Sequence, residues 1–229
     1  EVSDWIEKIV LVERLREVRA LIGFTRIDSP DKFSSLEELQ GVERASISRD
    51  VPQAVPASEI RGEGIFILFK EQKIKKWLKQ KAVKAKRDHF KEAHILWRKR
   101  LNYPNPEDNF PALRYVMLHT FSHVFMRQLA LECGYTAASI REKIYSVPAS
   151  EDKGPQAGLL IYTAAPDSEG TLGGLVAMGK KERLGYLIEQ ALESAKLCSS
   201  DPLCAEHEPL ADSQSTLHAA ACHACLFAP

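Results

Sequence analysis

The sequence lacks the segments that insert a protein into a membrane or export it from the cell. No apolar run approaches the ~18 residues needed to cross a bilayer, and no signal peptide is present. The 229 residues carry no net charge, with 31 Lys and Arg against 31 Asp and Glu. The 45% hydrophobic and 27% charged residues are typical of a soluble globular protein of one large or two small domains. These features predict an intracellular, cytoplasmic protein, and the start at Glu1 predicts a fragment of a longer chain.

The phosphate-binding motifs of nucleotide enzymes are also missing. The stretch AAPDSEGTLGGLVAMG is rich in glycine, but it has no P-loop lysine and matches neither GxxxxGK[ST] nor GxGxxG. Its acids Asp167 and Glu169 would repel phosphate. Ser168 has no nucleophile elbow around it, so a hydrolase triad with Asp167 and His123 is not favoured. A structured turn or a partner-docking loop is the preferred interpretation.

Two histidines have metal-binding spacing without the rest of the motif. His119 and His123 stand four residues apart in an expected helix, where both can face one metal. Thr120 replaces the glutamate of HExxH, and no carboxylate lies within one turn on that face. We therefore predict buried, hydrogen-bonded core histidines, and Cys133 is read as a small buried residue. A hydrolase or nuclease that uses His119, His123 and the acidic glycine-rich loop is the alternative.

Cysteines are few but concentrated. Four of the five fall in the last 32 residues, with the spacing C-x5-C…C-x2-C. The C-x2-C half lets two thiolates converge on one tetrahedral ion, and Zn²⁺ is the natural occupant. The pattern predicts a structural zinc site, with disulfides or a redox motif as weaker alternatives. The predicted ligands are Cys198, Cys204, Cys222 and Cys225, and His207 or a residue beyond Pro229 stays open as the fourth.

The zero net charge hides a strongly basic segment. Residues 70–100 contain thirteen Lys or Arg and three acids, so the remainder carries ten excess negative charges. A solvated lysine surface is one reading, and a surface that contacts DNA phosphates without reading sequence is the other. A third is a helix that binds an acidic surface of a partner protein. The predicted DNA-binding residues are Lys73, Lys75, Lys76, Lys79, Lys84 and Lys86.

Hydrophobic periodicity predicts a mixed chain. We expect helices at 2–22, 71–101, 112–133, from 136 or 139 to 145, and 180–197, strands at 65–69 and 158–163, a turn at 61–64, loop at 31–57 and a linker at 102–111. The fold class is α+β and helix-rich, with a small sheet of a few strands covered by helices and a C-terminal cysteine cluster that binds zinc. The expected domains are an N-terminal helical and basic region at 1–101 and a zinc-binding domain at 111–229.

Four stretches together resemble the DrmB family of the DISARM anti-phage defence system. They are LVERLREVRALIGFTRI, LHTFSHVFMRQLALECGYTAASIREKIYS, GLLIYTAAPDSEGTLGGLV, and LCSSDPLCAEHEP with ACHACLFAP. The histidine helix, the strand with its glycine loop and the cysteine cluster also look like the zinc-binding domain of Mrf-type DNA helicases. The resemblance covers nearly the whole chain, excluding 31–57. It implies a non-catalytic partner of a helicase ATPase carried on a separate chain, a pair that binds and moves on DNA, and zinc on the four cysteines.

Overall fold

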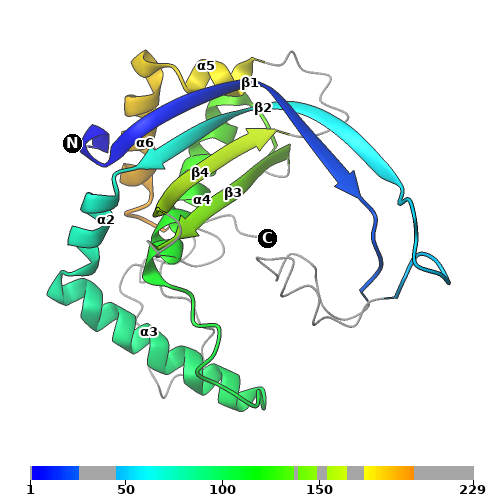
Figure 1. Cartoon of the computed structure of the whole chain (residues 1–229). Helices are drawn as coiled ribbons and strands as arrows, with labels where there is room; N and C mark the ends of the chain where they lie inside the picture. The colour runs from blue at the N-terminus through cyan, green and yellow to red at the C-terminus, as the bar shows by residue number, and fades with distance from the viewer. Residues whose placement is uncertain (1, 26–44, 137–138, 149–153, 164–172, 199–229) are drawn as a thin grey trace. The chain divides into compact units, whose positions relative to one another are not determined.

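The computed structural model describes residues 2–25, 45–136, 139–148, 154–163 and 173–198. These residues form a mixed helix and sheet fold, which confirms the predicted class, whereas the cysteine cluster lies almost entirely outside them. In chain order the elements are a 3-10 helix η1 (Val2–Asp4), β1 (Ile6–Ala20), β2 (Ala57–Phe69), α2 (Glu71–Leu78), α3 (Lys81–Arg100), α4 (Leu113–Cys133), β3 (Ile140–Val147), β4 (Gln156–Thr163), α5 (Gly174–Met178) and α6 (Lys181–Ser194) (Figure 1).

The four strands form one sheet in the order β1-β2-β4-β3. β4 lies between β2 and β3 and is antiparallel to both, so that Ile161 is opposite Ile65 on one side and Glu142 on the other. Side chains alternate between the two faces of a strand. Ile65, Glu142 and Ile161 therefore point to the same face of the sheet. The predicted strands at 65–69 and 158–163 are confirmed as parts of β2 and β4.

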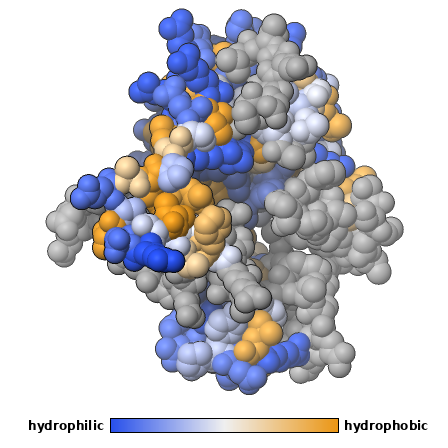
Figure 2. Space-filling model, turned by 90° about the vertical axis from the view of Figure 1, so that its right-hand side faces the viewer, coloured by the Kyte–Doolittle hydropathy of each residue, from blue (hydrophilic) through white to orange (hydrophobic). Residues whose placement is uncertain are grey.

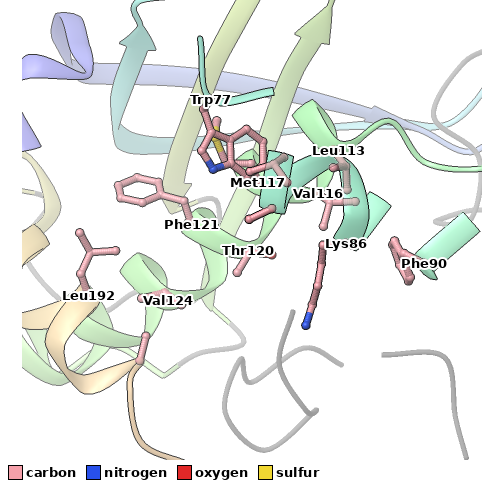
Figure 3. Close-up of a pocket in the computed structure, with 13 residues that line it drawn as sticks. Trp77, Lys86, Phe90, Leu113, Val116, Met117, Thr120, Phe121, Val124 and Leu192 are labelled. Carbon is pink, nitrogen blue, oxygen red and sulfur yellow. The ribbon is translucent and has the colours of Figure 1, made fainter. Parts of the chain in front are cut away.

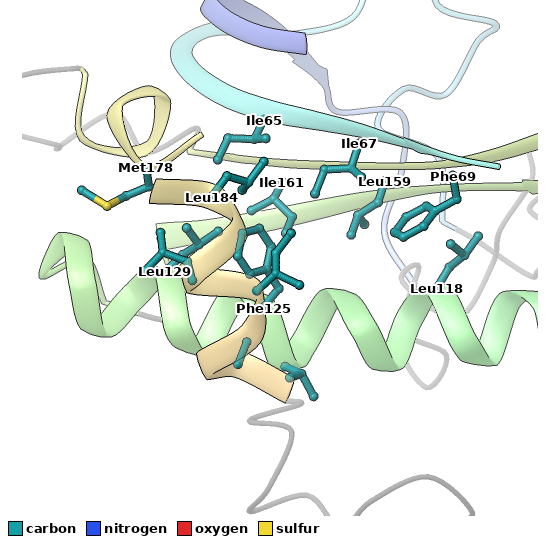
Figure 4. Close-up of a cluster of buried hydrophobic side chains, with 14 of the residues drawn as sticks. Ile65, Ile67, Phe69, Leu118, Phe125, Leu129, Leu159, Ile161, Met178 and Leu184 are labelled. Carbon is teal, nitrogen blue, oxygen red and sulfur yellow. The ribbon is translucent and has the colours of Figure 1, made fainter. Parts of the chain in front are cut away.

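Two helices, α4 and α6, lie against one face of this sheet and enclose the core (Figure 4). Ile67, Leu159 and Phe125 are fully buried between the layers. α4 has apolar residues all around it; Leu118, Phe125 and Leu129 are fully buried, whereas Leu131 is 72% exposed. The predicted helix at 112–133 is confirmed, with one side in the core. It ends at Gly134, whose φ of 71° is the left-handed cap conformation that glycine adopts most easily. The predicted helix at 180–197 is confirmed as α6.

The prediction of a helix at 2–22 was wrong, because most of this segment is strand β1. The helical pattern needed Val18 inside, but Val18 is 63% exposed. Its neighbours Glu17 and Arg19 are half-buried instead and form an ion pair at 2.5 Å. Burial from Leu15 onward therefore alternates with period two, as in a strand. Apolar spacing of three and four residues was coincidental here.

Two further local predictions were wrong. The segment ending near Tyr145 is not a helix but strand β3, in which the alternate residues Ile140, Glu142 and Ile144 face inward. The expected turn at 61–64 lies within β2, since Gly64 pairs with Tyr162 of β4. A Cβ atom on Gly64 would lie 2.7 Å from the carbonyl oxygen of Ile161, so glycine permits a close approach of strands here rather than a turn.

The basic helix predicted at 71–101 is confirmed as helical but is not continuous. It breaks into α2 and α3 at Gln80, whose ψ of 139° is extended. Near the start of α2, Glu71 forms a bidentate ion pair with Arg114, which also donates to the carbonyl of Gln156 at 3.2 Å. Arg114 is buried, and the pair connects α2 to α4 and to the edge of β4. The predicted linker at 102–111 contains no helix or strand.

The chain divides into two compact units, one of residues 1–15 with 62–229 and one of residues 16–61. In the second unit, Leu21 N donates to Pro56 O at 2.9 Å, and Phe24 pairs with Ala45 in an isolated bridge. Residues 45–56 contain no further regular element, in agreement with the predicted loop, and 26–44 lie outside the described residues. The predicted domain boundary at 102–110 falls inside the first unit and stays a prediction.

Candidate functional site

The predicted zinc ligands are described at only one position. Cys198 is half-buried and lies four residues beyond the end of α6. Cys204, Cys222 and Cys225 lie outside the described residues, as do the acidic glycine-rich loop at 164–172 and His207. The cysteine ligand set therefore stays a prediction that rests on donor chemistry: four thiols with this spacing suit Zn²⁺.

The six predicted DNA-binding lysines lie on α2 and α3. Lys76, Lys79 and Lys84 are exposed, and none forms an ion pair within the part of the chain that the structure covers. Lys73 is 3.7 Å from Asp4 and Lys75 is 3.9 Å from Glu71, which partly neutralises those two charges. The remaining one, Lys86, is half-buried at the edge of a pocket. The exposed lysines are thus the strongest candidates for phosphate contacts, and DNA binding itself stays a prediction.

The end of α3 adds residues that were not predicted for the site. Arg98, Lys99 and Arg100 form its last turn, and the guanidinium of Arg98 lies 4.2 Å from the ring centroid of Tyr103. Trp97 stacks on Tyr103 and is 40% exposed. At the bottom of Figure 2, which holds this end of α3, hydrophilic side chains surround a smaller group of hydrophobic ones. Cationic and aromatic side chains together are typical of surfaces that bind nucleic acid.

A pocket of about 580 Å³ opens between α2, α3, α4 and α6. Its lining is almost entirely apolar and includes Trp77, Val116 and Phe121 (Figure 3). Lys86 extends its amino group away from these side chains, so that its aliphatic stem covers apolar surface while its charge stays at the edge. The pocket runs along Val116, Thr120 and Val124 of α4, and Thr120 and Val124 directly follow His119 and His123 in sequence. The lining residues with nitrogen or oxygen atoms in their side chains are Trp77, Lys86 and Thr120.

The histidines of α4 meet a carboxylate that sequence reasoning missed. His119 Nε2 lies 2.8 Å from His123 Nε2 and 3.1 Å from Glu142 Oε1, and His123 Nε2 lies 3.5 Å from the same oxygen. His123 is buried, as predicted, but the side chain of His119 is 39% exposed. Glu142 lies on β3. The pairing of β3 with β4 places this side chain on the face of the sheet next to α4. No carboxylate of α4 lies within one turn of the histidines, but a carboxylate of another element contacts both.

Glu142 is held in its charged form. Burial alone would raise the pKa of this carboxyl, but hydrogen bonds from His119, His123 and Ser122, together with the electrostatic interaction with His119, outweigh burial and lower the pKa to about 2. Its second oxygen, Oε2, is buried and has no hydrogen-bond partner among the residues that the structure describes. Burial, and to a smaller extent the charge of Glu142, raises the pKa of Tyr115, whose ring lies 5.4 Å from that of His119. In this cluster, an anionic carboxylate therefore lies beside two imidazole rings.

The family described as MrfA Zn-binding domain matches residues 121–226, which include part of α4, His123, Glu142 and all four clustered cysteines. Over 225 residues, or 97% of its length, the chain is 39% identical to the DISARM protein DrmB of Bacillus paralicheniformis. The predicted resemblance to DrmB is confirmed. The chain spans about 38% of the length of that relative. Within the described residues, no helix has the length and apolar character to cross a membrane.

Proposed function

We propose that this chain is part of a non-catalytic, DNA-binding accessory subunit of a DISARM-type anti-phage defence system. Its similarity to a DISARM protein along 97% of its length supports the defence role. The observation that supports DNA binding is the surface of α2 and α3, where Lys76, Lys79 and Lys84 are exposed and without ion pairs among the described residues. Phosphate contacts of this kind carry no base specificity. The subunit binds DNA of any sequence and partners a helicase or translocase ATPase on another chain.

Zinc has a structural role in this proposal. Cys198, Cys204, Cys222 and Cys225 would hold the ion, and the ion would supply a fixed cross-link for a segment that follows α6 and is rich in small and polar residues. Removal of the ion, or Cys222→Ser, then lowers the thermal stability of the chain. A folded chain whose metal content and stability are the same with and without all four cysteines would contradict this role.

The salt dependence of DNA binding tests the lysine surface directly. Binding of a fluorescent duplex is measured by anisotropy across a range of salt concentrations. Each phosphate contact contributes about −0.9 to the slope of log K against log salt, so six contacts predict a slope of about −5. The triple change of Lys76, Lys79 and Lys84 to Gln should weaken binding and reduce the slope to about −3.

A matched control separates a specific surface from a general effect of charge. The same change at Lys8, Lys143 and Lys181 also removes three exposed positive charges, but from β1, β3 and α6. We expect this control to bind DNA with nearly the slope of the unmodified chain. If both triple variants lose the same affinity, or if binding does not depend on salt, the assignment to α2 and α3 is wrong. Competition between DNA and an acidic partner protein for the same lysines would instead favour an assembly module.

A further inference from the structure

We propose that His119, His123 and Glu142 form a second metal site, which binds a divalent first-row transition ion independently of the cysteine cluster. The three donor atoms are separated by 2.8, 3.1 and 3.5 Å. Donors in a tetrahedral zinc site, with bonds of 2.0–2.2 Å, are separated by about 3.3 Å. An ion can therefore contact all three atoms with side-chain movements of a few tenths of an ångström.

Hydrogen bonds alone do not satisfy this arrangement. Each neutral ring carries at most one proton on Nε2. If both nitrogens are protonated, two donors face each other at 2.8 Å. If only one is, its proton serves one contact, and a lone pair of the other ring faces the lone pairs of Glu142 Oε1 at 3.1 or 3.5 Å. A cation satisfies all three contacts at once, because every donor atom then directs a lone pair at it.

The donor chemistry selects the class of ion. Two imidazoles and one carboxylate form the set that holds zinc in several metalloenzymes, and the same set with open positions binds ferrous iron. Calcium and magnesium prefer sites made of oxygen atoms only. Glu142 contributes an anionic oxygen ligand within 3.5 Å of both imidazole nitrogens, and such a ligand favours a divalent ion. Because His119 is 39% exposed, water can reach the remaining coordination position.

The ligands are held by rigid elements. His119 and His123 are one turn apart on α4, whose core-facing residues are fully buried, so their spacing does not depend on a loop. Glu142 lies within the ladder between β3 and β4, opposite Ile161. The ring of Tyr115 packs at 5.4 Å from His119 and restricts its rotation. Sites built on helices and strands hold their ligands more firmly than sites on loops.

Metal content of the whole chain tests the proposal. The chain is treated with a chelator, reloaded with Zn²⁺, dialysed and measured for zinc per chain. We expect one ion at the cysteines and one at the histidines. His119→Gln and Glu142→Gln should each lose the second ion, with a decrease in zinc affinity of about 100-fold or more. His89→Gln is the control, since His89 is exposed on α3 and away from the cluster in sequence.

Cobalt distinguishes the two sites. In a chain with Cys204→Ser and Cys222→Ser, added Co²⁺ should still bind and show visible bands, but not the near-ultraviolet band that thiolate ligands produce. Loss of these visible bands on Glu142→Gln, in protein that circular dichroism shows to be folded, supports the proposal. If zinc is lost in the histidine variants but not in the cysteine variants, the result supports the histidine site and contradicts the proposed structural zinc at the cysteines. Unchanged zinc content and cobalt spectra in both His119→Gln and Glu142→Gln would overturn it.

Discussion

Glu63 provides the sharpest test of how the fold is held together. This carboxylate is 1% exposed on β2, and it accepts hydrogen bonds from the backbone N–H groups of Leu175 at 2.7 Å and Val176 at 3.3 Å. The hydroxyl of Tyr135 donates to it at 3.3 Å. A single side chain of the sheet therefore satisfies the first turn of α5, whose N–H groups have no partner within the helix. Glu63→Ala removes that connection.

The magnitude follows from the groups that are left behind. Each buried N–H without a partner costs about 1–3 kcal/mol, and two are created. Relief of the cost of burying a carboxylate offsets part of this loss. We expect a net loss of about 3 kcal/mol in the free energy of unfolding. A chain of this size loses about 2–4 °C in melting temperature per kcal/mol, so the transition should move down by roughly 6–12 °C.

The assay is thermal unfolding followed by circular dichroism, with Glu132→Ala as the control. Glu132 is exposed on α4 and accepts one hydrogen bond from Gln128 at 3.2 Å, so its removal should change the melting temperature by only a degree or two. Glu63→Gln keeps one acceptor oxygen and should fall between the two. Equal melting temperatures for Glu63→Ala and Glu132→Ala would refute the reasoning that Glu63 anchors α5.

Further outcomes are expected for two glycines and for Cys133. Gly64→Ala should destabilise the chain by about 1–3 kcal/mol, because the new Cβ would lie 2.7 Å from the carbonyl oxygen of Ile161. In Gly185→Ala, on α6, the new Cβ meets no atom within 4 Å, so the change should stabilise the chain by about 0.5–1 kcal/mol. Urea titrations in which both glycine changes shift stability in the same direction would contradict these two expectations. Burial, helped by the charge of Glu63, raises the pKa of the Cys133 thiol from 9.0 to about 11. Its alkylation rate should therefore reach half its maximum near pH 11, and its contribution to stability, present below pH 9, should be lost as the pH rises to 11. Half-maximal alkylation near pH 9 would show an accessible thiol.

The parts of the fold that could be predicted are those where one signal dominates. The apolar run around Ile65 and Ile67 and the one around Leu159 are short, contain β-branched residues and are flanked by glycine, which favours a buried strand. The apolar segment of α4 is too long for a strand and favours a helix. β1 and β3 were mistaken for helices because charged residues occupy inward positions in both. Glu17 and Glu142 face the side that a binary pattern assigns to apolar residues, so the period of two was hidden.

The candidate site shows the same limit more sharply. The spacing of His119 and His123 was visible in the sequence, but their carboxylate partner is nineteen residues beyond His123 and on another element. Only the register that places Glu142 opposite Ile161 brings it under α4. Inward positions of a strand are usually apolar, so an ionisable residue such as Glu142 is an exception there. Exceptions of this kind are expected at functional sites. If residues 140–147 are treated as a strand, the inward position of Glu142 is visible in the sequence.

The position of β1 has a consequence for how copies of this protein behave beside one another. β1 is an outer strand of the sheet, and an exposed edge is a template on which a second chain can add its own strand. The exposed side chains of β1 include Glu7, Lys8, Glu13 and Arg14, so charges of both signs alternate along that edge. A second copy that paired with this edge would place some like charges next to each other. It would also remove other charged side chains from water. Exposed charges at a sheet edge disfavour the pairing of two such edges, so we expect β1 to disfavour strand addition by a second copy.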